Sequence, residues 1–354
     1  MKIKEIQHKI SEENLDAFFF TSSANIFYLT NFKSSYGFVI LTPSHKIFIT
    51  DNRYYLEARK KLKTWQIILI DNTKKQIEQL AEIMYEYGGK KIGFEEDKIT
   101  LSFYKNLKNK TNAKLVGYNG FLNDFRKTKT NEEIFILSEA ISKTDKIFKK
   151  ILNEIPKSTS ELDIRRRIIN NIFLEDGEGE SFPSIVAIGK NSAVPHHETY
   201  KEPIRKNNII LIDMGIKFKG YCSDFTRVIA YGKVDEELTK IFKIVKEAHQ
   251  TALDIIKPKI PAKEIDKAAR KVIEKYGYGK YFTHSTGHGI GVEIHEAPRI
   301  SQFSDEIIEE NMVFTIEPGI YIPGKGGIRL ESVVVARKNE VEILTKTPLE
   351  FFRI

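Results

Sequence analysis

The segment from residue 208 to residue 231 reads as two strands joined by a tight turn, and it constrains the fold more than any other stretch. It runs NIILIDMGIKFKGYCSDFTRVIAY, with a predicted turn at Lys219–Gly220. Asp213 ends the first apolar run, and Asp224 follows eleven residues later. In an antiparallel hairpin with an even-numbered loop, residues an odd distance apart across the turn point to the same face. We therefore expect the two carboxylates to converge.

Two carboxylates on one face of a hairpin need a positive partner. Side chains directly opposite each other in an antiparallel pair have β-carbons about 5 Å apart, and carboxylates that close repel each other strongly. A divalent metal ion between Asp213 and Asp224 is the simplest solution. In the alternative interpretation, one aspartate caps a turn and the other faces solvent, so that no ion is needed.

Two glutamates in the C-terminal part of the chain favour the metal site. Glu317 stands in FTIEPGIY and Glu331 in GGIRLESVVVA, and both runs otherwise read as apolar strands. An ionised glutamate that faces inward without a partner is costly, so each is expected to have one. With the two aspartates and His288, these glutamates would supply five oxygen and nitrogen donors.

A histidine-rich segment, HSTGHGIGVEIHEAP, covers residues 284–298. The spacing of His284 and His288 would suit a zinc pair on one face of a helix. The three glycines of the segment each disfavour a helix by about 1 kcal/mol relative to alanine. We therefore predict a loop that leads into a strand, in which the glycines allow the backbone to approach a metal closely. Any metal here must find its other ligands elsewhere.

The composition is that of an ordinary globular protein, and 354 residues are enough for two domains. No apolar run approaches the roughly 18 residues of a membrane-spanning helix, and the charged N-terminus lacks the apolar block of a signal peptide. We therefore expect a cytoplasmic protein without a membrane partner. The single cysteine, Cys222, excludes an intramolecular disulfide and a cysteine-based zinc cluster.

The net charge of +8 raises the question of a nucleic-acid partner, because clustered basic residues neutralise phosphates. Here the lysines are scattered among acidic residues in helix-like runs such as EARKKLK and DKAARKVIEKYG, a pattern typical of solvated helix faces. Zinc-finger spacings, RNA-recognition signatures and phosphate-loop motifs are absent from the sequence. We therefore expect no nucleic-acid partner.

The first third of the chain alternates strand and helix patterns, which is typical of an α/β domain. Strands are predicted in LDAFFFTS, GFVILT, KIFIT, WQIILI and KKIGF, and helices in DNRYYLEARKKL and TKKQIEQLAEIMYEYG. The pattern becomes polar around residues 119–131 and then restarts as a long helix. We place the domain boundary there, which divides the chain into residues 1–125 and 126–354.

In the second part, helices are predicted at about 131–155, 159–176, 235–256 and 262–276. Besides the hairpin, strands are predicted in FPSIVAIG, MVFTIEPGIYIP and IRLESVVVAR. A pair of helices followed by β segments thus occurs twice. This order indicates a duplicated architecture, although the two halves share no strong sequence repeat.

The five donors occur in a fixed order: Asp213 and Asp224, the histidine of STGHGIG, the glutamate of TIEPG and the glutamate of RLE. This order resembles the pita-bread metallopeptidases, in particular the aminopeptidase P and prolidase branch, over residues 130–350. The resemblance implies an α+β fold, with a pita-bread (creatinase/aminopeptidase) domain at 126–354. A smaller α/β creatinase-type N-terminal domain would precede it at 1–125, where NIFYLTNFKSSYGFVILT also resembles that domain.

The resemblance also implies the roles of the donors. In the family these positions hold two divalent metal ions, so the predicted metal ligands are Asp213, Asp224, His288, Glu317 and Glu331. Asp224 and Glu331 would bridge both ions, Asp213 would complete one, and His288 with Glu317 would complete the other. Four carboxylates and one imidazole form a fairly hard set, which favours manganese over cobalt or zinc.

Two further histidines favour the proline-directed branch. His196 follows Pro195 in NSAVPHHE, and His295 stands in GVEIHEAPR, at positions where proline-specific members carry histidines. Both are predicted to be catalytic and substrate-binding residues. They would hydrogen-bond the substrate carbonyl or its oxyanion, or position the proline side, and the sequence does not decide between these tasks. His197 is interpreted as a neighbour that packs or contacts solvent.

Glu317 and Arg329 complete the predicted site. As a catalytic residue, Glu317 would accept a proton from the attacking water and deliver it to the leaving nitrogen. Arg329 is predicted to bind substrate by orienting a carboxylate through a bidentate hydrogen bond. Alternatively, Arg329 is a structural partner of Asp224 or Glu331. His284 is predicted to lie near the site without binding metal.

The resemblance predicts a metallo-exopeptidase that cleaves between an N-terminal residue and proline, as either an Xaa-Pro aminopeptidase or an Xaa-Pro dipeptidase. Proline-containing peptides would be its substrates, and it would form a homodimer. The alternatives are a non-catalytic pita-bread binding module and a metal-independent creatinase-like hydrolase, and the complete ligand set disfavours both. The choice between aminopeptidase and dipeptidase depends on what closes the site beyond the proline.

Overall fold

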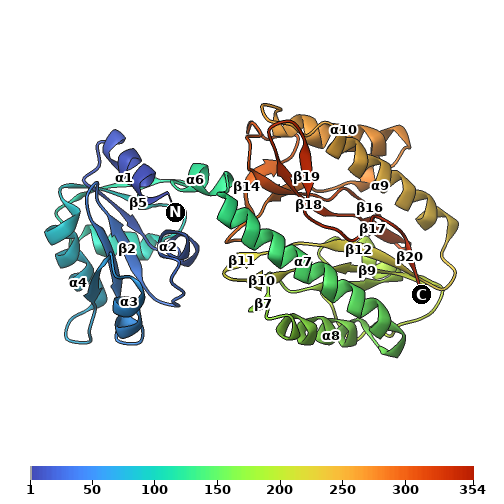
Figure 1. Cartoon of the computed structure of the whole chain (residues 1–354), viewed down its shortest axis with the longest axis horizontal. Coiled ribbons are helices and arrows are strands. Elements are labelled where there is room, and N and C mark those ends of the chain that lie inside the picture. Colours follow the sequence, from blue (N-terminus) through green and yellow to red (C-terminus); the bar gives the residue numbers. More distant parts are fainter. Residues whose placement is uncertain (1) are drawn as a thin grey trace. The chain divides into compact units, whose positions relative to one another are not determined.

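The computed structural model describes residues 2–354, which form two compact units (Figure 1). The first unit ends at Phe125, and the second comprises Arg126–Ile354. Helix α6 (Asn123–Lys127) contains the junction in the chain. The first unit has one sheet and the second has several, and each unit has a hydrophobic core of its own.

The described part of the first unit has the α/β architecture that the sequence predicts. Its elements are α1 (Ile3–Glu12), β1 (Ala17–Phe20), α2 (Ser23–Thr30), β2 (Phe38–Leu41), β3 (Lys46–Thr50), α3 (Tyr55–Lys61), β4 (Gln66–Leu69), α4 (Gln76–Ile83), a π-helical turn (Met84–Gly88), β5 (Lys91–Glu95), α5 (Leu101–Lys108) and β6 (Lys114–Tyr118). The strands form one mixed sheet in the order β4-β3-β2-β1-β5-β6. Strand β2 is antiparallel to both of its neighbours, whereas the pairs β3–β4, β1–β5 and β5–β6 are parallel.

Helices α2 and α5 and strand β6 were not predicted. Helix α2 lacks amphipathic spacing because six of its eight residues are buried. Its start is held by Glu95 at the end of β5, whose carboxylate accepts the N–H groups of Thr21 and Ser22 at 2.6 and 2.8 Å. A carboxylate at a helix N-terminus is stabilised by the unpaired N–H groups there. The contact joins residues far apart in the chain, so a local sequence pattern does not reveal it.

The second unit contains two helix pairs, each followed by β segments (Figure 1). Its longer helices are α7 (Asn131–Glu154), α8 (Glu161–Leu174), α9 (Glu236–Asp254) and α10 (Ala262–Lys275), which agree with the predicted helices to within about two residues at each end. The strands are β7 (Gly179–Glu180), β8 (Ile185–Ile188), β9 (Asn208–Asp213), β10 (Ile216–Phe218), β11 (Tyr221–Cys222), β12 (Thr226–Tyr231), β13 (Gly287–Gly289), β14 (Glu296–Ile300), β15 (Val313–Ile316), β16 (Gly319–Ile322), β17 (Gly326–Arg329), β18 (Ser332–Ala336), β19 (Val341–Ile343) and β20 (Phe352–Arg353). They form sheets in the orders β20-β12-β9-β8, β14-β13-β15-β18-β19, β11-β10-β7 and β16-β17.

Strand β9 is covered on both faces by helices. Ile209 and Leu211 belong to the core cluster that includes α9 and α10. Ile210 and Ile212 belong to the cluster that includes α7 and α8. Successive side chains of a strand point to opposite faces, so a strand buried on both sides reads as an unbroken apolar run. Asp213 is the first acidic residue after this run, and it lies where the strand leaves the core.

Two of the predicted strands are each divided in two by a glutamate. MVFTIEPGIYIP splits into β15 and β16 at Glu317 and Pro318, and IRLESVVVAR splits into β17 and β18 at Leu330 and Glu331. Strand β15 pairs with β18 in one sheet, whereas β16 pairs with β17 in another. Pro318 cannot donate a hydrogen bond to a ladder, which favours a break at that point. Both glutamates therefore lie where the chain changes from one sheet to another, rather than inside continuous strands as predicted.

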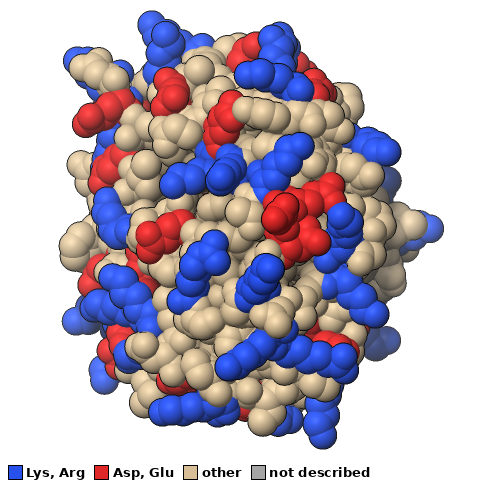
Figure 2. All heavy atoms as spheres, turned by 90° about the vertical axis from the view of Figure 1, so that its right-hand side faces the viewer, with Lys and Arg blue, Asp and Glu red and all other residues tan. Residues whose placement is uncertain are grey.

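Charged side chains of both signs are mixed on the molecular surface. Figure 2 shows one face on which Lys and Arg side chains are interspersed with Asp and Glu side chains. The sequence predicted such a surface, because its lysines are scattered among acidic residues. None of the helices in residues 2–354 combines the length and apolar character that a membrane crossing requires.

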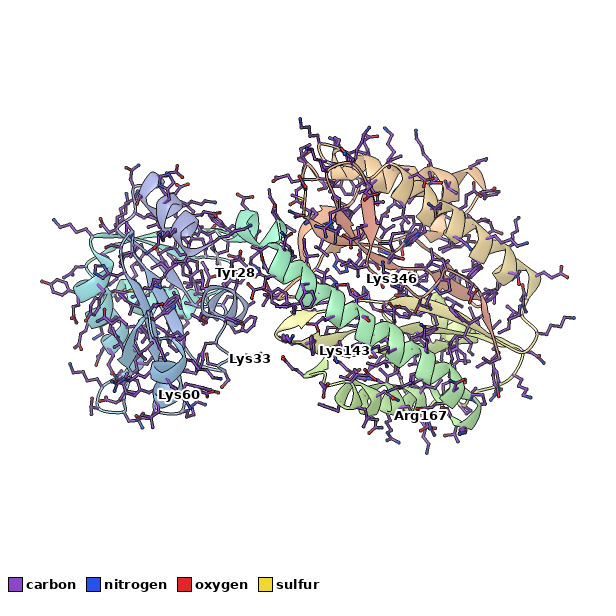
Figure 3. All side chains as sticks on the ribbon, viewed as in Figure 1. Tyr28, Lys33, Lys60, Lys143, Arg167 and Lys346 are labelled. Atoms are coloured by element: carbon purple, nitrogen blue, oxygen red, sulfur yellow. The ribbon has the colours of Figure 1, made fainter. Side chains whose placement is uncertain are left out.

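Helix α7 begins with a capping box and anchors the C-terminal segment. Thr130 Oγ1 accepts the N–H of Glu133 at 3.2 Å, and the Glu133 carboxylate accepts the N–H of Thr130 at 2.8 Å. Further along α7, the Asp145 carboxylate accepts the N–H groups of Lys346, labelled in Figure 3, and Thr347 at 2.8 and 2.9 Å. The start of this helix is thus specified locally, and its middle is tied to a distant part of the unit.

Thr130→Ala is expected to lower the free energy of unfolding of the second unit by about 1 kcal/mol, because it removes the acceptor for an N–H at the helix start. Thr251→Ala within α9 is the matched control, since its hydroxyl donates only to the Glu247 carbonyl of its own helix and alanine favours helices. Urea unfolding followed by circular dichroism measures both variants. Equal stability of Thr130→Ala and the parent chain would contradict the role of the cap.

Candidate metal and substrate site

The two aspartates come from the hairpin that the sequence predicts. Lys219 and Gly220 have φ values of 49° and 81°, as a two-residue turn between β10 and β11 requires. Asp213 ends β9 and is paired with Thr226 of β12. Asp224 lies two residues before Thr226, in the irregular stretch between β11 and β12. Both aspartates line the same cavity.

Glu317 and Glu331 line this cavity from the two points at which the chain changes sheets. The N–H of Glu317 donates to the Thr286 carbonyl at 2.7 Å, and Thr315 Oγ1 donates to Glu317 Oε1 at 3.2 Å. Thr226 Oγ1 donates to Glu331 Oε2 at 2.8 Å. Each glutamate is therefore held at its carboxylate by a neighbouring threonine.

His288 adds a nitrogen donor to the four carboxylates. Its Nε2 lies 3.5 Å from Asp224 Oδ2 and 3.3 Å from Glu317 Oε1. The candidate ligand atoms of Asp224, His288 and Glu331 all lie within 4.8 Å of one another. His288 Nδ1 is 3.1 Å from the Gly289 carbonyl. A hydrogen on Nδ1 would fix the ring there and leave the Nε2 lone pair facing the carboxylates.

His288 lies on the short strand β13 rather than in the predicted loop. This strand pairs with β14 and β15. A β-carbon at Gly287 would lie 1.9 Å from the Thr315 carbonyl oxygen, and one at Gly289 would lie 2.1 Å from that of Ala297. These glycines let neighbouring strands approach closely, and their predicted role in bringing the backbone close to a metal stays a prediction.

Burial and mutual repulsion shift the pKa values of the site. The pKa of Asp224 is raised well above its ordinary value by burial and by the charges of Glu331 and Asp213. Burial and neighbouring carboxylates also raise the pKa of Glu331. Burial raises the pKa of Glu317 to about 8. In contrast, burial lowers the pKa of His288 to about 4, so its ring is neutral at pH 7, as a metal ligand must be.

Arg329 brings a positive charge to the edge of the carboxylate cluster. Its Nη2 donates to Asp213 Oδ2 at 2.5 Å, and its Nη1 donates to the Tyr321 hydroxyl at 2.8 Å. Only 3% of Arg329 is exposed. Its structural partner is therefore Asp213, and the predicted pairing with Asp224 or Glu331 is wrong. Its predicted contact with substrate stays a prediction.

Two buried carboxylate oxygens, Asp213 Oδ1 and Glu331 Oε1, have no hydrogen-bond partner among the described residues. Buried polar atoms are rarely left without a partner. A divalent cation would satisfy both oxygens and offset the repulsion among the carboxylates. The residues therefore fit such ions, and those that would hold them are Asp213, Asp224, His288, Glu317 and Glu331.

The carboxylate cluster opens onto a cavity of about 700 Å³. His196 and His295 also line it, and both are exposed. The rings of His288 and His295 meet edge to face, with centroids 4.3 Å apart. Burial, reinforced by nearby His196, lowers the pKa of His295. Apolar and basic residues complete much of the lining, among them Phe182, Pro183, Ile185, Ile294 and Arg299. The cavity thus combines an apolar wall with a few polar groups, as small-ligand sites do.

Arg299 of β14 lines the cavity, and the sequence analysis did not single it out. Its side chain is exposed, and its backbone N–H donates to Glu306 at 2.6 Å. The residue stands four positions after His295 in HEAPR. His295 lies in a bend before β14, so simple strand alternation does not relate the two side chains, and the sequence offered no specific signal for Arg299.

His284 contacts Tyr321 rather than the carboxylates. Its Nε2 lies 2.8 Å from the Tyr321 hydroxyl, and its Nδ1 lies 2.8 Å from the Ser285 carbonyl. Burial lowers the pKa of His284 to about 3. The residue thus lies beside the site with both ring nitrogens engaged by protein groups, which agrees with its predicted place outside the ligand set.

Helix α10 holds the segment before β13 in place. Asp266 and Arg270 pair with each other through two hydrogen bonds of 2.9 and 3.0 Å. Asp266 Oδ1 accepts the N–H and hydroxyl of Thr286 at 3.1 and 2.8 Å. Arg270 donates to the His284 carbonyl at 3.0 Å. Because Thr286 accepts the N–H of Glu317, this pair positions a candidate ligand. The pair has the common i,i+4 spacing of a surface helix, so the sequence offered no specific signal for it.

At pH 7 we expect Mn²⁺ binding to release protons, because the pKa of Glu317 lies near 8 in the metal-free protein. A bound cation favours the ionised carboxylate, so affinity is expected to rise as pH rises toward 8. Calorimetric titration in buffers of different ionisation enthalpy counts the protons released per ion. Glu317→Gln should release fewer protons than the parent chain. A parent chain that binds Mn²⁺ without releasing protons would contradict the raised pKa.

Comparison with known proteins identifies relatives over the whole chain. An Xaa-Pro dipeptidase of Pyrococcus horikoshii is 33% identical over 99% of this chain and 98% of its own length. A solved Xaa-Pro dipeptidase from Bacillus anthracis is 36% identical with a TM-score of 0.95, and the match covers 100% of this chain and 99% of that one. A solved X-Pro aminopeptidase from Thermotoga maritima is 32% identical with a TM-score of 0.89, covering 97% and 99% of the two chains.

Two family models match consecutive parts of the chain. Residues 2–128 match the creatinase/prolidase N-terminal domain, and residues 136–338 match metallopeptidase family M24. These matches confirm the family resemblance and the fold class that the sequence predicted. The chain therefore belongs to metallopeptidase family M24, and it carries the creatinase/prolidase type of N-terminal domain.

Proposed function

We propose that this protein is an Xaa-Pro dipeptidase that uses two divalent ions, expected to be manganese. The observation that carries the proposal is the group of five metal-donor residues and two histidines around one cavity. The relatives named Xaa-Pro dipeptidase and X-Pro aminopeptidase, which match nearly the whole chain, support it. A non-catalytic binding module would have no use for this costly set of buried carboxylates.

Glu317 is the proposed proton carrier. When bound, divalent ions would activate a water molecule and stabilise negative charge on the substrate carbonyl oxygen. Glu317 reaches the cavity with one oxygen held by Thr315. It would accept the proton of the attacking water and pass it to the proline nitrogen. That nitrogen carries no hydrogen in the peptide, so it must gain a proton to leave.

His196 and His295 are the proposed substrate-binding and catalytic histidines. Both line the cavity beside the carboxylates, and both are exposed to a ligand. Burial and His196 lower the pKa of His295, so its ring is mostly neutral at pH 7. A neutral imidazole donates one hydrogen bond, which suits the substrate carbonyl oxygen and the charge that develops on it.

Arg299 favours a dipeptide over a longer peptide. The proline of an Xaa-Pro dipeptide bears a free carboxylate, whereas that of a longer peptide does not. Arg299 lines the cavity, and none of the described acidic side chains forms an ion pair with it. Arg329, the substrate-binding arginine predicted from the sequence, also lines the cavity, but its guanidinium already donates to Asp213 and Tyr321. We therefore assign the carboxylate-binding role to Arg299, through charge-assisted hydrogen bonds.

Protein stripped with a chelator and reloaded with Mn²⁺ should hydrolyse Ala-Pro, and it should hydrolyse Ala-Pro-Ala more slowly. The release of free alanine measures both reactions. Asp224→Asn should abolish activity and weaken Mn²⁺ binding, because it removes one of the carboxylates that would hold the ions. No hydrolysis of either peptide with manganese, cobalt or zinc would refute the enzyme assignment. Faster cleavage of the tripeptide would assign an aminopeptidase instead.

Arg299→Gln should lower kcat/KM for Ala-Pro by about 10- to 100-fold, mainly through KM, because it removes hydrogen bonds to a charged group. Ala-Pro-amide, which lacks the carboxylate, should be cleaved equally well by the variant and the parent chain. Arg205→Gln is the control, since Arg205 is exposed and lies outside the cavity lining. An equal loss on both substrates would show that Arg299 does not bind the carboxylate.

A further inference from the structure

His196 and His197 are neighbours on a β-turn, and the first is exposed whereas the second is buried. The N–H of His197 donates to the Val194 carbonyl at 3.1 Å, which closes the turn. Pro195 occupies the second position, where its fixed φ is favoured. His196 is exposed and lines the cavity, whereas His197 is only 9% exposed. The two adjacent imidazoles therefore lie in different surroundings, that of His196 at the cavity and that of His197 in the interior.

His197 contacts the buried carboxylate of Glu161, the first residue of α8. His197 Nε2 lies 2.8 Å from Glu161 Oε2. Glu161 Oε1 accepts the N–H of Ile188 at 2.7 Å and the side-chain amide of Asn191 at 2.9 Å. Glu161 is fully buried, and a carboxylate in the first turn of a helix is stabilised by the helix dipole. This one carboxylate thus joins α8, the end of β8 and the turn.

The side chains next to the turn are partly exposed, although the His197 ring meets the Tyr200 ring edge to face with centroids 5.3 Å apart. Val194 and nearby Tyr200 are 53% and 48% exposed. On the cavity side, Arg329 Nη1 lies 3.4 Å from the Pro195 carbonyl, which is a long hydrogen bond. The contact between His197 and Glu161, at 2.8 Å, is the shorter of these two side-chain hydrogen bonds that hold the turn. A carboxylate only accepts hydrogen bonds, so His197 Nε2 is the donor.

We propose that the His197–Glu161 pair positions the turn and thereby holds the His196 imidazole in the substrate cavity. The inference rests on the proposed function, because it concerns how His196 meets the substrate. His197 is then a positioning residue that acts through His196, in addition to packing in the interior, which was one of the two interpretations from the sequence. A displacement of about 1 Å in a substrate-contacting group can reduce a rate about 100-fold, so a remote anchor of this kind matters.

A double-mutant cycle between His197 and His196 tests the proposal. In the parent chain, His197→Ala should lower kcat for Ala-Pro by about 10- to 100-fold. In a His196→Ala background, the same change should cause no further loss, because the group it positions is already gone. Equal losses in the two backgrounds would overturn the proposal, since a purely structural role would act in both.

Recovery of kcat in a conservative variant and spectroscopy of the histidines provide two further tests. His197→Gln should recover part of the lost kcat, because its amide can donate to Glu161. In Glu161→Gln, the ¹⁵N-detected imidazole signals of His196 and His197 should both shift, while the absorption spectrum of bound Co²⁺ stays unchanged. A changed Co²⁺ spectrum, or an unshifted His196 signal, would contradict positioning through the turn.

Glu133→Gln is the matched control, because Glu133 is also a buried carboxylate in the first turn of a helix. Glu133 contacts Thr130 and Tyr221 instead of the turn, so the variant should lower stability and leave kcat unchanged.

The proposed function and the proposed role of His197 fail in different ways. A parent chain inactive on every Xaa-Pro peptide refutes the function, whereas an active parent chain with additive losses in the cycle refutes the role of His197.

Discussion

Repulsion among buried carboxylates is the constraint on which the rest of the second unit depends. Asp213, Asp224, Glu317 and Glu331 line one cavity, and burial with mutual repulsion raises the pKa values of the last three. Arg329 offsets part of this charge through Asp213. An arrangement this costly persists only when the surrounding structure holds it rigidly and when cations are available to bind.

The scaffold meets this demand by holding the backbone of the ligands rather than their side chains alone. Arg227 is fully buried and donates to the backbone carbonyls of Glu331, Thr347 and Pro348. Burial lowers its pKa to about 10, yet it stays charged at neutral pH. Hydrogen bonds to a charged donor are strong. Arg227 therefore connects the segment that contains Glu331 to the C-terminal segment. In a similar way, Asp266 of α10 binds Thr286, whose carbonyl accepts the N–H of Glu317.

The sequence predicted what local patterns control and missed what distant contacts control. The hairpin at Lys219 could be predicted because its turn and apolar runs are contiguous. Pro318 signals a break after Glu317, but the sheet that each segment joins at Glu317 and Glu331 could not be predicted, because it depends on strands far away in the chain. The partner of Arg329 was missed for the same reason, since Asp213 lies far away in the chain. The family resemblance gave the set of metal-donor residues, but it did not give the residues that hold them in place, such as Arg227 and Asp266.

His196 and His295, the two exposed histidines that line the cavity, share one local arrangement. His196 precedes buried His197, which contacts Glu161. His295 precedes Glu296, whose side chain is buried and pairs with Lys129 and Arg126. In both cases an exposed imidazole is followed at once by a buried side chain that is bonded to a polar or charged partner. Loop and turn residues are on average more mobile than the elements they connect, so a buried polar contact at the next position would restrain the exposed ring without occupying the cavity.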